Sequence, residues 1–324
     1  MKVFITGHKG FIAKNLVWAL EALGHSVVHP SSLFKTNNRG EPCVFRNTED
    51  AWSAFFTESA VDYVIHNAAL VGTDVVALNP HEATLSNVMG THTICRAARQ
   101  ANKPVCYMGT SVIYDTPKYQ NEPISETSDI SPGTFYGAQK LAGEHIVKST
   151  AKDWLIMRPL FAFGGVGDMN SLPAKTFFAH RRGLDKLSMF LDPKKSKDYM
   201  HVDDFCDAVA LACHNGLWGN DFNVSAERPL QTGKIVDLMS EICGSDLNAL
   251  IDWHPETDYL GNHLLTSEKF RRASNWQPSL TLESGLQQSW RSIKTSTANY
   301  DPLRHLDSAK QRGLDLKQFF PKAS

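Results

Sequence analysis

The chain has 324 residues, of which 42% are hydrophobic and 21% charged, and its formal net charge is −1. This length predicts one large α/β domain or two unequal domains, and this composition excludes a largely disordered polypeptide. Because there is no excess of Lys and Arg, we expect neither a nucleic-acid-binding protein nor one that binds an anionic membrane surface.

No apolar run approaches the roughly 20 residues of a membrane-spanning helix, and glycine follows the first apolar residues too early for a signal peptide. We therefore expect a cytoplasmic protein. The six cysteines form no CxxC motif, which predicts buried free thiols rather than a zinc site or a disulfide framework.

The N-terminal residues alternate between strand and helix patterns. Residues 2–6 are β-branched and aromatic and predict a strand, and residues 12–23 carry apolar side chains at helical spacing. Gly24 ends this helix, and residues 25–29 predict a second strand. The three elements form a βαβ unit, which implies parallel pairing.

The same alternation continues to about residue 165, after which the sequence becomes rich in Gly, Asp and Asn. The remaining expected elements are strands at 61–67, 104–108, 154–158 and 221–224, and helices near 80–101, 136–149, 173–182 and 204–214. The predicted fold class is therefore α/β, a doubly wound parallel sheet of the Rossmann type with a smaller C-terminal domain.

The turn between the first strand and the first helix is rich in glycine. Gly7 permits a tight turn, Gly10 lets a phosphate approach the backbone, and Ala13 is small enough for the helix to pack on the strand. The backbone amides of Phe11 and Ile12 begin the helix and favour an anion. This pattern predicts the pyrophosphate site of a dinucleotide, with an ordinary βα turn as the alternative.

Tyr136 and Lys140 lie four residues apart in a predicted helix, so both side chains leave the same face. The ammonium group of Lys140 favours the phenolate form of Tyr136 and thereby lowers the phenol pKa, which makes the tyrosine a candidate general acid/base. Taken alone, this spacing is also typical of an exposed helix pair.

Two hydroxyl residues, Thr110 and Ser111, follow the strand predicted at 104–108. Open α/β sheets bind their ligands at this carboxyl edge, where a hydroxyl can hydrogen-bond a reacting oxygen. A capping or turn role is the alternative for either residue.

Together these motifs resemble the extended short-chain dehydrogenase/reductase superfamily, in its branch of nucleotide-sugar epimerases, dehydratases and reductases. The resemblance runs from Met1 to about Trp290. Its other matching segments are His66-Asn67-Ala68-Ala69, Asn87-Val88-Met89-Gly90-Thr91, Arg158-Pro159 through Phe163-Gly164, Tyr199 through Asp204, Trp276-Gln277-Pro278 and Leu282 through Leu286.

The resemblance implies roles for individual residues. Tyr136 would be the catalytic acid/base, Lys140 would bind the nicotinamide ribose, and Thr110 would complete the triad, with Ser111 contacting the substrate or replacing Thr110 if the loop is shifted. Asn170 would contact the diphosphate of the sugar nucleotide. Ala68 and Ala69 would line the cofactor site together with the glycine turn.

Some positions depart from known branches of the superfamily. Ser111 and Val112 stand where dehydratases carry an acidic pair, so elimination of water would lack its acid and base. The turn Gly7-His8-Lys9-Gly10 is similar to that of GDP-fucose synthases, but Val112 replaces their cysteine, which argues against epimerisation at carbon 3 or 5.

The leading functional hypothesis is an oxidoreductase that reduces the 4-keto carbon of a nucleotide-linked sugar, with Tyr136 protonating the oxygen that Thr110 orients. A 4-epimerase with tightly bound NAD would use the same residues twice and is the alternative. A non-catalytic NADP-binding regulator is disfavoured because all three catalytic positions are present.

Cofactor choice depends on the end of the second strand, where His29 is followed by Ser31 without the acidic residue that normally binds the adenosine ribose in NAD sites. Hydrogen bonds from Ser31 and the charge of Lys9 predict NADP. Glu49 and Asp50 lie downstream and keep NAD as the alternative.

We expect residues 1–165 to form the dinucleotide-binding Rossmann domain, with residues 198–222 returning to it. Residues 166–197 and 223–290 would form the substrate-binding domain, and residues 291–324 a C-terminal tail. The expected partner is a nucleotide sugar, with no metal, and the resemblance implies a homodimer through the helices that contain Asn87 and Tyr136.

Overall fold

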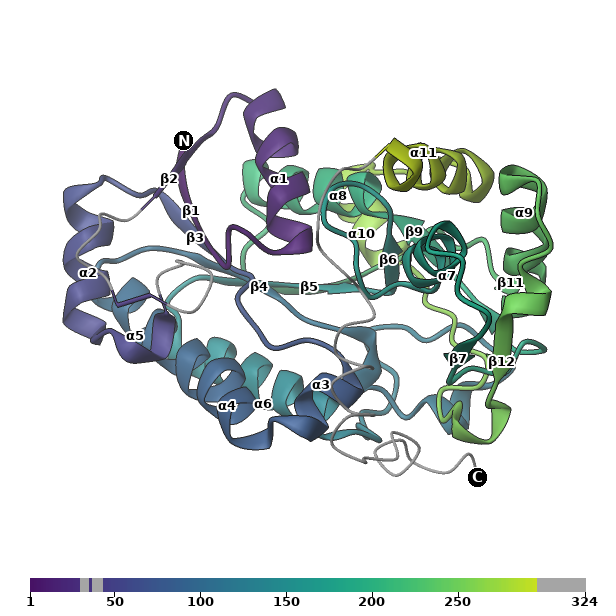
Figure 1. Cartoon of the computed structure of the whole chain (residues 1–324). Coiled ribbons are helices and arrows are strands. Elements are labelled where there is room, and N and C mark those ends of the chain that lie inside the picture. Colours follow the sequence, from purple (N-terminus) through teal and green to yellow (C-terminus); the bar gives the residue numbers. More distant parts are fainter. Residues whose placement is uncertain (30–34, 37–42, 296–324) are drawn as a thin grey trace.

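The computed structural model describes residues 1–29, 35–36 and 43–295. Its centre is a parallel sheet of six strands in the order β2-β1-β3-β4-β5-β10 (Figure 1). These strands are β1 (Lys2–Thr6), β2 (Ser26–Val28), β3 (Tyr63–His66), β4 (Val105–Met108), β5 (Trp154–Pro159) and β10 (Asn220–Val224). The predicted fold class is therefore confirmed.

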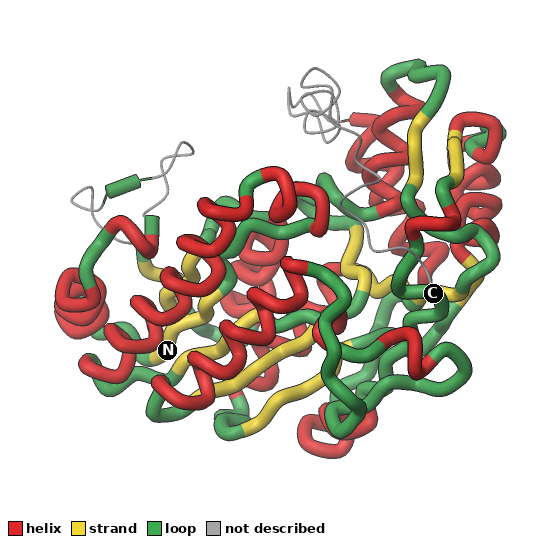
Figure 2. Tube along the Cα trace, turned by 90° about the horizontal axis from the view of Figure 1, so that it is seen from below, coloured by secondary structure: helices red, strands yellow, loops and turns green. Residues whose placement is uncertain are grey.

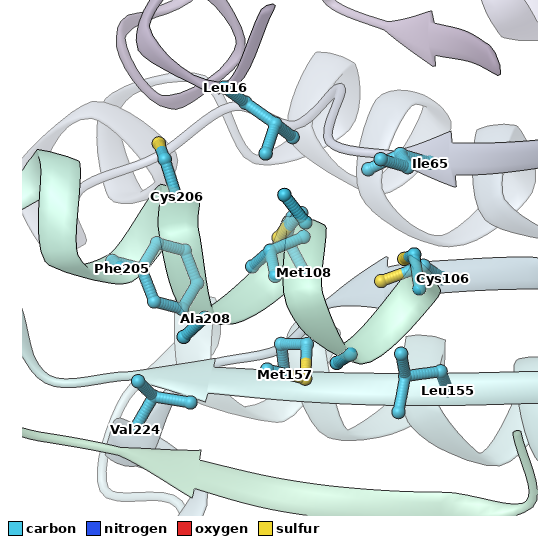
Figure 3. Close-up of a cluster of buried hydrophobic side chains, with 14 of the residues drawn as sticks. Leu16, Ile65, Cys106, Met108, Leu155, Met157, Phe205, Cys206, Ala208 and Val224 are labelled. Atoms are coloured by element: carbon cyan, nitrogen blue, oxygen red, sulfur yellow. The ribbon is translucent and has the colours of Figure 1, made fainter. Parts of the chain in front are cut away.

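Helices cover both faces of this sheet (Figures 1 and 2). One face packs against α1 (Phe11–Ala22), α8 (Val202–His214) and α10 (Glu268–Ser274), and the other against α2 (Glu49–Glu58), α5 (Gly90–Gln100) and α6 (Phe135–Thr150). The strands supply side chains to both cores by alternation: Val3 and Ile5 face the α1 side, whereas Phe4 faces the α2 side. Figure 3 shows the α1 side, where Leu16, Phe205, Met108 and Met157 belong to one buried cluster.

The helix expected near residues 80–101 is interrupted. It consists of α4 (Pro80–Thr84), a π-helical turn η2 (Leu85–Met89) and α5, and it is preceded by α3 (Thr73–Leu78). Short 3-10 turns form at η1 (Val44–Arg46), η3 (Ser111–Ile113) and η4 (Thr116–Tyr119). π-helical turns are frequent at functional sites, and this one contains Asn87.

A third apolar core lies away from the central sheet, among α7 (Leu172–Arg181), α9 (Thr232–Cys243) and α11 (Leu282–Thr295). Three two-stranded pairs surround it: β6 (Phe161–Phe163) with β9 (Tyr199–His201), β7 (Leu187–Met189) with β12 (Ile251–Trp253), and β8 (Ser196–Lys197) with β11 (Leu230–Gln231). The 3-10 turns η5 (Asn248–Leu250) and η6 (Pro255–Thr257) complete the described elements. This core is separate from the two cores that flank the central sheet. It therefore supports our proposal that the chain forms two interleaved domains.

All cysteines of the sequence lie within the described part of the chain. All six cysteines are free there, and five of them are buried. No cluster of potential metal ligands occurs among the described residues, and none of their helices is long and apolar enough to cross a membrane.

Candidate functional site

The candidate site lies where the strand order of the sheet reverses. β1 pairs with β2 on one side and with β3 on the other, so the connections that leave β1 and β3 diverge at their carboxyl ends. Doubly wound sheets bind their ligands at such a switch point. The glycine turn follows β1, and residues 67–72 follow β3.

The glycine turn is shaped by close backbone contacts. Gly7 has a φ of +67°, which favours glycine, and its carbonyl accepts a 2.8 Å hydrogen bond from the Gly10 nitrogen. A Cβ at Gly7 would stand 3.0 Å from the Ala68 Cα, and a Cβ at Gly10 would stand 3.0 Å from the Gly7 oxygen. Both positions therefore need glycine for this turn to form.

The first turn of α1 fits a phosphate group. Gly10 precedes the helix without a side-chain cap, and the first turn, which begins with Phe11 and Ile12, contains no acidic residue. The backbone N–H groups and the positive end of the helix dipole therefore have no competing carboxylate in this turn. Ala13 is fully buried against the sheet, as its small size predicts.

A buried hydrogen-bond network supports the turn from below. The Thr6 hydroxyl accepts from the backbone nitrogens of Asn67 (3.0 Å) and Ala68 (2.9 Å) and donates to His66 Nδ1 at 2.8 Å. His66 Nε2 then donates to the Thr91 hydroxyl at 3.0 Å. Burial lowers the pKa of His66 to about 3, with a further contribution from Lys140. The imidazole is thus neutral, and it connects the ends of β1 and β3 to α5.

Asn87 holds the loop after β3 in place. Its amide oxygen accepts from the Leu70 nitrogen at 2.7 Å, and its amide nitrogen donates to the Leu70 carbonyl and to Gln139 Oε1, each at 2.9 Å. Gln139 in turn donates to the Thr84 hydroxyl at 3.1 Å. Because Gln139 precedes Lys140 on α6, this clamp links the loop after β3 to the helix that carries Tyr136.

Lys140 is almost completely buried. Its ammonium donates to the Met108 carbonyl and lies 4.1 Å from the centre of the Tyr107 ring. Burial lowers the pKa of Lys140 to about 7, although the negative charge of Glu144 opposes this shift. The Tyr107 ring also contacts the ring of His66, which brings the Lys140 side of the site next to the glycine turn.

Tyr136 is half-buried near the start of α6, where Thr134 caps the helix by accepting from the Gly137 nitrogen at 3.1 Å. Burial raises the pKa of the Tyr136 phenol above its ordinary value, and a hydrogen bond with the Thr110 side chain opposes this shift. The sequence predicts that Lys140 lowers this pKa. In the structure burial is the larger effect, and the ammonium is directed to the Met108 carbonyl.

The remaining predicted residues lie at the edges of the site. Ser111 is buried in η3, directly after Thr110, and Lys9 is exposed in the glycine turn. Asn170 is exposed just before Ser171, which caps α7. Ser31 lies outside the described residues. The parts that these residues play in binding therefore stay predictions.

Sequence reasoning missed Tyr259, which follows η6. Its ring packs over Gly133, and its phenol is close enough to Tyr136 to affect the pKa of that residue. No local pattern marks Tyr259, because its place beside α6 depends on the packing of a distant segment. The role of His66 was also missed, although a polar residue at the end of a buried strand is a signal that could have indicated it.

Comparison with known proteins agrees with this geometry. A UDP-glucose 4-epimerase of Mycolicibacterium smegmatis is 25% identical over 88% of this chain and 96% of its own length. A putative GDP-L-fucose synthase of Arabidopsis thaliana is 24% identical over 89% of this chain and 90% of its own. The crystal structure of a UDP-glucuronic acid 4-epimerase from Bacillus cereus with UDP-glucuronic acid and NAD has a similar fold, with a TM-score of 0.76, 21% identity and coverage of 91% and 99%.

The sequence profile described as "NAD dependent epimerase/dehydratase family" matches residues 3–225, which is more than half of the chain. The matched region contains the glycine turn, the loop after β3, Thr110 and the Tyr136–Lys140 pair. The expected resemblance is therefore confirmed, and the chain belongs to the NAD dependent epimerase/dehydratase family of enzymes.

Proposed function

We propose that this enzyme reduces the 4-keto carbon of a nucleotide-linked sugar, with NADP as cofactor and Tyr136 as general acid/base. The observation that carries the proposal is the position of the Tyr136 phenol. It meets the Thr110 hydroxyl at the carboxyl edge of the sheet, one helical turn from the buried Lys140.

Each residue has a distinct task in this proposal. A bound nicotinamide would supply the hydride. Tyr136 would give its proton to the oxygen of the reacting carbonyl, and Thr110 would hold that oxygen by a hydrogen bond. Lys140 would bind the nicotinamide ribose and stabilise the phenolate that remains. The His66 network and the Asn87 clamp would hold the ends of β1 and β3 in a fixed position relative to α5 and α6.

The residues at the end of β2 support NADP. His29 stands where a carboxylate would bind the adenosine ribose, and its ring lies 5.0 Å from the ring of His8 in the glycine turn. Glu49, the acidic alternative, interacts with Arg96 at 3.2 Å and with His92 at 3.6 Å. Lys9 is the cation that we propose for the 2′-phosphate.

A 4-epimerase with tightly bound NAD is the second candidate. The Mycolicibacterium and Bacillus relatives carry this activity in their names, and the Bacillus structure contains NAD. The same phenol would remove a proton in one half-reaction and return it in the other. The two candidates differ in whether reduced cofactor is consumed.

The absorbance of the reduced nicotinamide distinguishes the reductase from the epimerase. Purified enzyme is given NADPH or NADH with a panel of UDP-, GDP- and dTDP-linked sugars and their 4-keto derivatives. Net consumption of cofactor supports the reductase, and turnover without consumption supports the epimerase. Tyr136→Phe should abolish turnover while the cofactor still binds. If no sugar nucleotide shows Tyr136-dependent turnover, the proposal is wrong.

Direct titration tests the cofactor assignment. We expect the wild-type protein to bind NADPH more tightly than NADH, and Lys9→Ala to weaken NADPH binding by about 1–3 kcal/mol while NADH binding changes little. Lys14→Ala, in the first turns of α1, is the matched control. Equal weakening of both cofactors by Lys9→Ala would contradict a 2′-phosphate contact.

We also propose that the protein is a homodimer through α5 and α6. Met89 is 50% exposed at the end of η2, directly before α5, and Phe135 is 49% exposed at the start of α6. Large apolar side chains on such a surface favour association. Light scattering of the wild-type protein and of Met89→Lys measures this directly, with a monomeric mass expected only for the variant.

A further inference from the structure

Tyr259 belongs to the segment between η6 and α10, far in sequence from the helix that carries Tyr136. This segment is firmly held on the substrate-domain side. Asp258 accepts from Lys197 Nζ and from the Asp192 nitrogen, each at 2.9 Å. Both Lys197 and Asp258 are buried, so their ion pair is shielded from water.

The other side of Tyr259 is also anchored. Asn262 Oδ1 accepts from the Ser196 nitrogen at 2.9 Å, and Asn262 Nδ2 donates to the Gln120 carbonyl at 2.9 Å. Gln120 Oε1 accepts from the Asn262 nitrogen at 2.8 Å, and Gln120 Nε2 donates to the Leu260 carbonyl at 3.1 Å. The backbone of Tyr259 is therefore fixed between two polar anchors, which reduces the entropy that its side chain must lose on binding a ligand.

From this fixed backbone the ring extends to the catalytic helix. A Cβ placed on Gly133 would stand 3.2 Å from Tyr259 Cδ2, so the ring lies directly over the turn before α6. The phenol is near the hydroxyls of Thr134 and Thr73, and it influences Tyr136. Tyr259 is nevertheless only half-buried, as Tyr136 is.

The chemistry of this arrangement suits a sugar ring. A molecule that brings a carbonyl or alcohol oxygen to Tyr136 also carries hydroxyls on the neighbouring carbons. A phenol both donates and accepts, so it can hydrogen-bond a sugar hydroxyl in either direction. The apolar ring meanwhile offers a flat face to the sugar.

We propose that Tyr259 is a substrate-binding residue, which hydrogen-bonds a sugar hydroxyl next to the reacting carbon. This inference rests on the proposed function, because it assumes a sugar nucleotide as substrate. It adds a contact from the substrate domain to a site whose other named residues come mainly from the Rossmann domain.

The test compares Tyr259→Phe with Tyr119→Phe and Tyr136→Phe. Tyr119 is the matched control, since it is also half-buried but its hydroxyl accepts from the Asp129 nitrogen at 2.9 Å. Steady-state kinetics with the sugar nucleotide that the wild-type enzyme turns over give kcat and KM. Cofactor titration and thermal unfolding are measured on every variant.

We expect Tyr259→Phe to raise KM for the sugar nucleotide about tenfold, the effect of one lost hydrogen bond, with kcat, cofactor affinity and Tm close to those of the wild type. Tyr119→Phe should leave KM unchanged. An unchanged KM in Tyr259→Phe overturns the inference. A lowered Tm with unchanged KM overturns it in favour of a purely structural tie between the domains.

The experiments distinguish failure of the proposed function from failure of the role of Tyr259. If Tyr136→Phe abolishes turnover while Tyr259→Phe behaves as the wild type, only the role of Tyr259 is refuted. If the wild-type enzyme shows no Tyr136-dependent turnover of any sugar nucleotide, the proposed function is refuted and the role of Tyr259 with it.

Discussion

Lys140 is nearly completely buried, and burying its charged ammonium group costs desolvation free energy. Three features reduce that cost: the Met108 carbonyl, the face of the Tyr107 ring, and the negative charge of Glu144. Even so, burial lowers the pKa of Lys140 to about 7, so this group changes its charge near neutral pH. A lysine with this property next to a tyrosine is typical of a functional site rather than of a stabilising ion pair.

Replacement of Lys140 by Met should lower turnover by more than tenfold and shift the remaining pH optimum upward. The reason is that loss of the nearest cation raises the pKa of Tyr136, so the phenol that donates the proton stays protonated up to a higher pH. The measurement is kcat/KM between pH 6 and 10. Lys148→Met, on the same helix but paired with Asp221 at 2.8 Å, is the control. An unchanged pH profile in Lys140→Met would refute this role.

Thr110 and Ser111 are adjacent, yet they should contribute differently. Thr110 hydrogen-bonds the Tyr136 phenol, whereas Ser111 begins the buried turn η3. Thr110→Val should therefore lower turnover about tenfold or more, and Ser111→Ala should have the smaller effect. Parallel kinetic assays of both variants decide the point, and the reverse ranking would identify Ser111 as the reacting-oxygen partner.

At the scale of elements, the position of α6 on the sheet depends on a glycine. A Cβ at Gly143 would stand 2.1 Å from the Tyr107 hydroxyl, so any larger residue requires the buried Tyr107 ring or the helix to shift. The ammonium of Lys140 lies over the Tyr107 ring, so the distance between α6 and β4 also sets how far Tyr136 and Lys140 lie from the sheet. Helix packing and site geometry are thus coupled here.

Gly143→Ala should lower the free energy of unfolding by about 1–3 kcal/mol because of this overpacking. Gly90→Ala is the matched control, since a Cβ there meets its nearest neighbours at ordinary distances of 3.6–3.7 Å. It should stabilise the protein by about 0.5–1 kcal/mol through helix propensity. Urea unfolding of both variants measures the difference, and equal effects would show that the Tyr107 contact does not constrain α6.

At the scale of the whole molecule, two fully buried histidines make the fold sensitive to acid. Burial lowers the pKa of both His66 and His263 from 6.5 to about 3. The unfolded chain therefore binds more protons than the folded one between these values. Each histidine therefore makes its full contribution to the free energy of unfolding above about pH 6.5. This contribution is lost as the pH falls toward 3, by about 1.4 kcal/mol per pH unit for each histidine.

His263→Asn provides the test, because the asparagine keeps an acceptor for the Thr116 hydroxyl, which lies 3.2 Å from His263 Nδ1, but does not titrate. Free energies of unfolding in urea at pH 7.5, 6.5 and 5.5 should fall less steeply for the variant, by about 1.4 kcal/mol per pH unit below pH 6.5. The same slope in both proteins would mean that His263 does not contribute.

The sequence by itself determined the features that short segments encode. Short β-branched and aromatic runs placed the strands of the Rossmann sheet, as at residues 2–6, and the glycines of the turn followed from backbone sterics. The four-residue spacing of Tyr136 and Lys140 put both on one helix face. Helix ends were predicted within about two residues at 11–22 and 135–150, because caps and helix breakers are local as well.

Only the tertiary structure decided how distant segments meet. The ammonium of Lys140 lies beside the Met108 carbonyl, His66 bridges Thr6 and Thr91, and the ring of Tyr259 lies over Gly133, just before α6. The three small sheets and the π-helical turn were equally unforeseen. These contacts join residues that are far apart in the chain, and their cost in desolvation and chain entropy is offset only when the whole core forms, so no local pattern can record them.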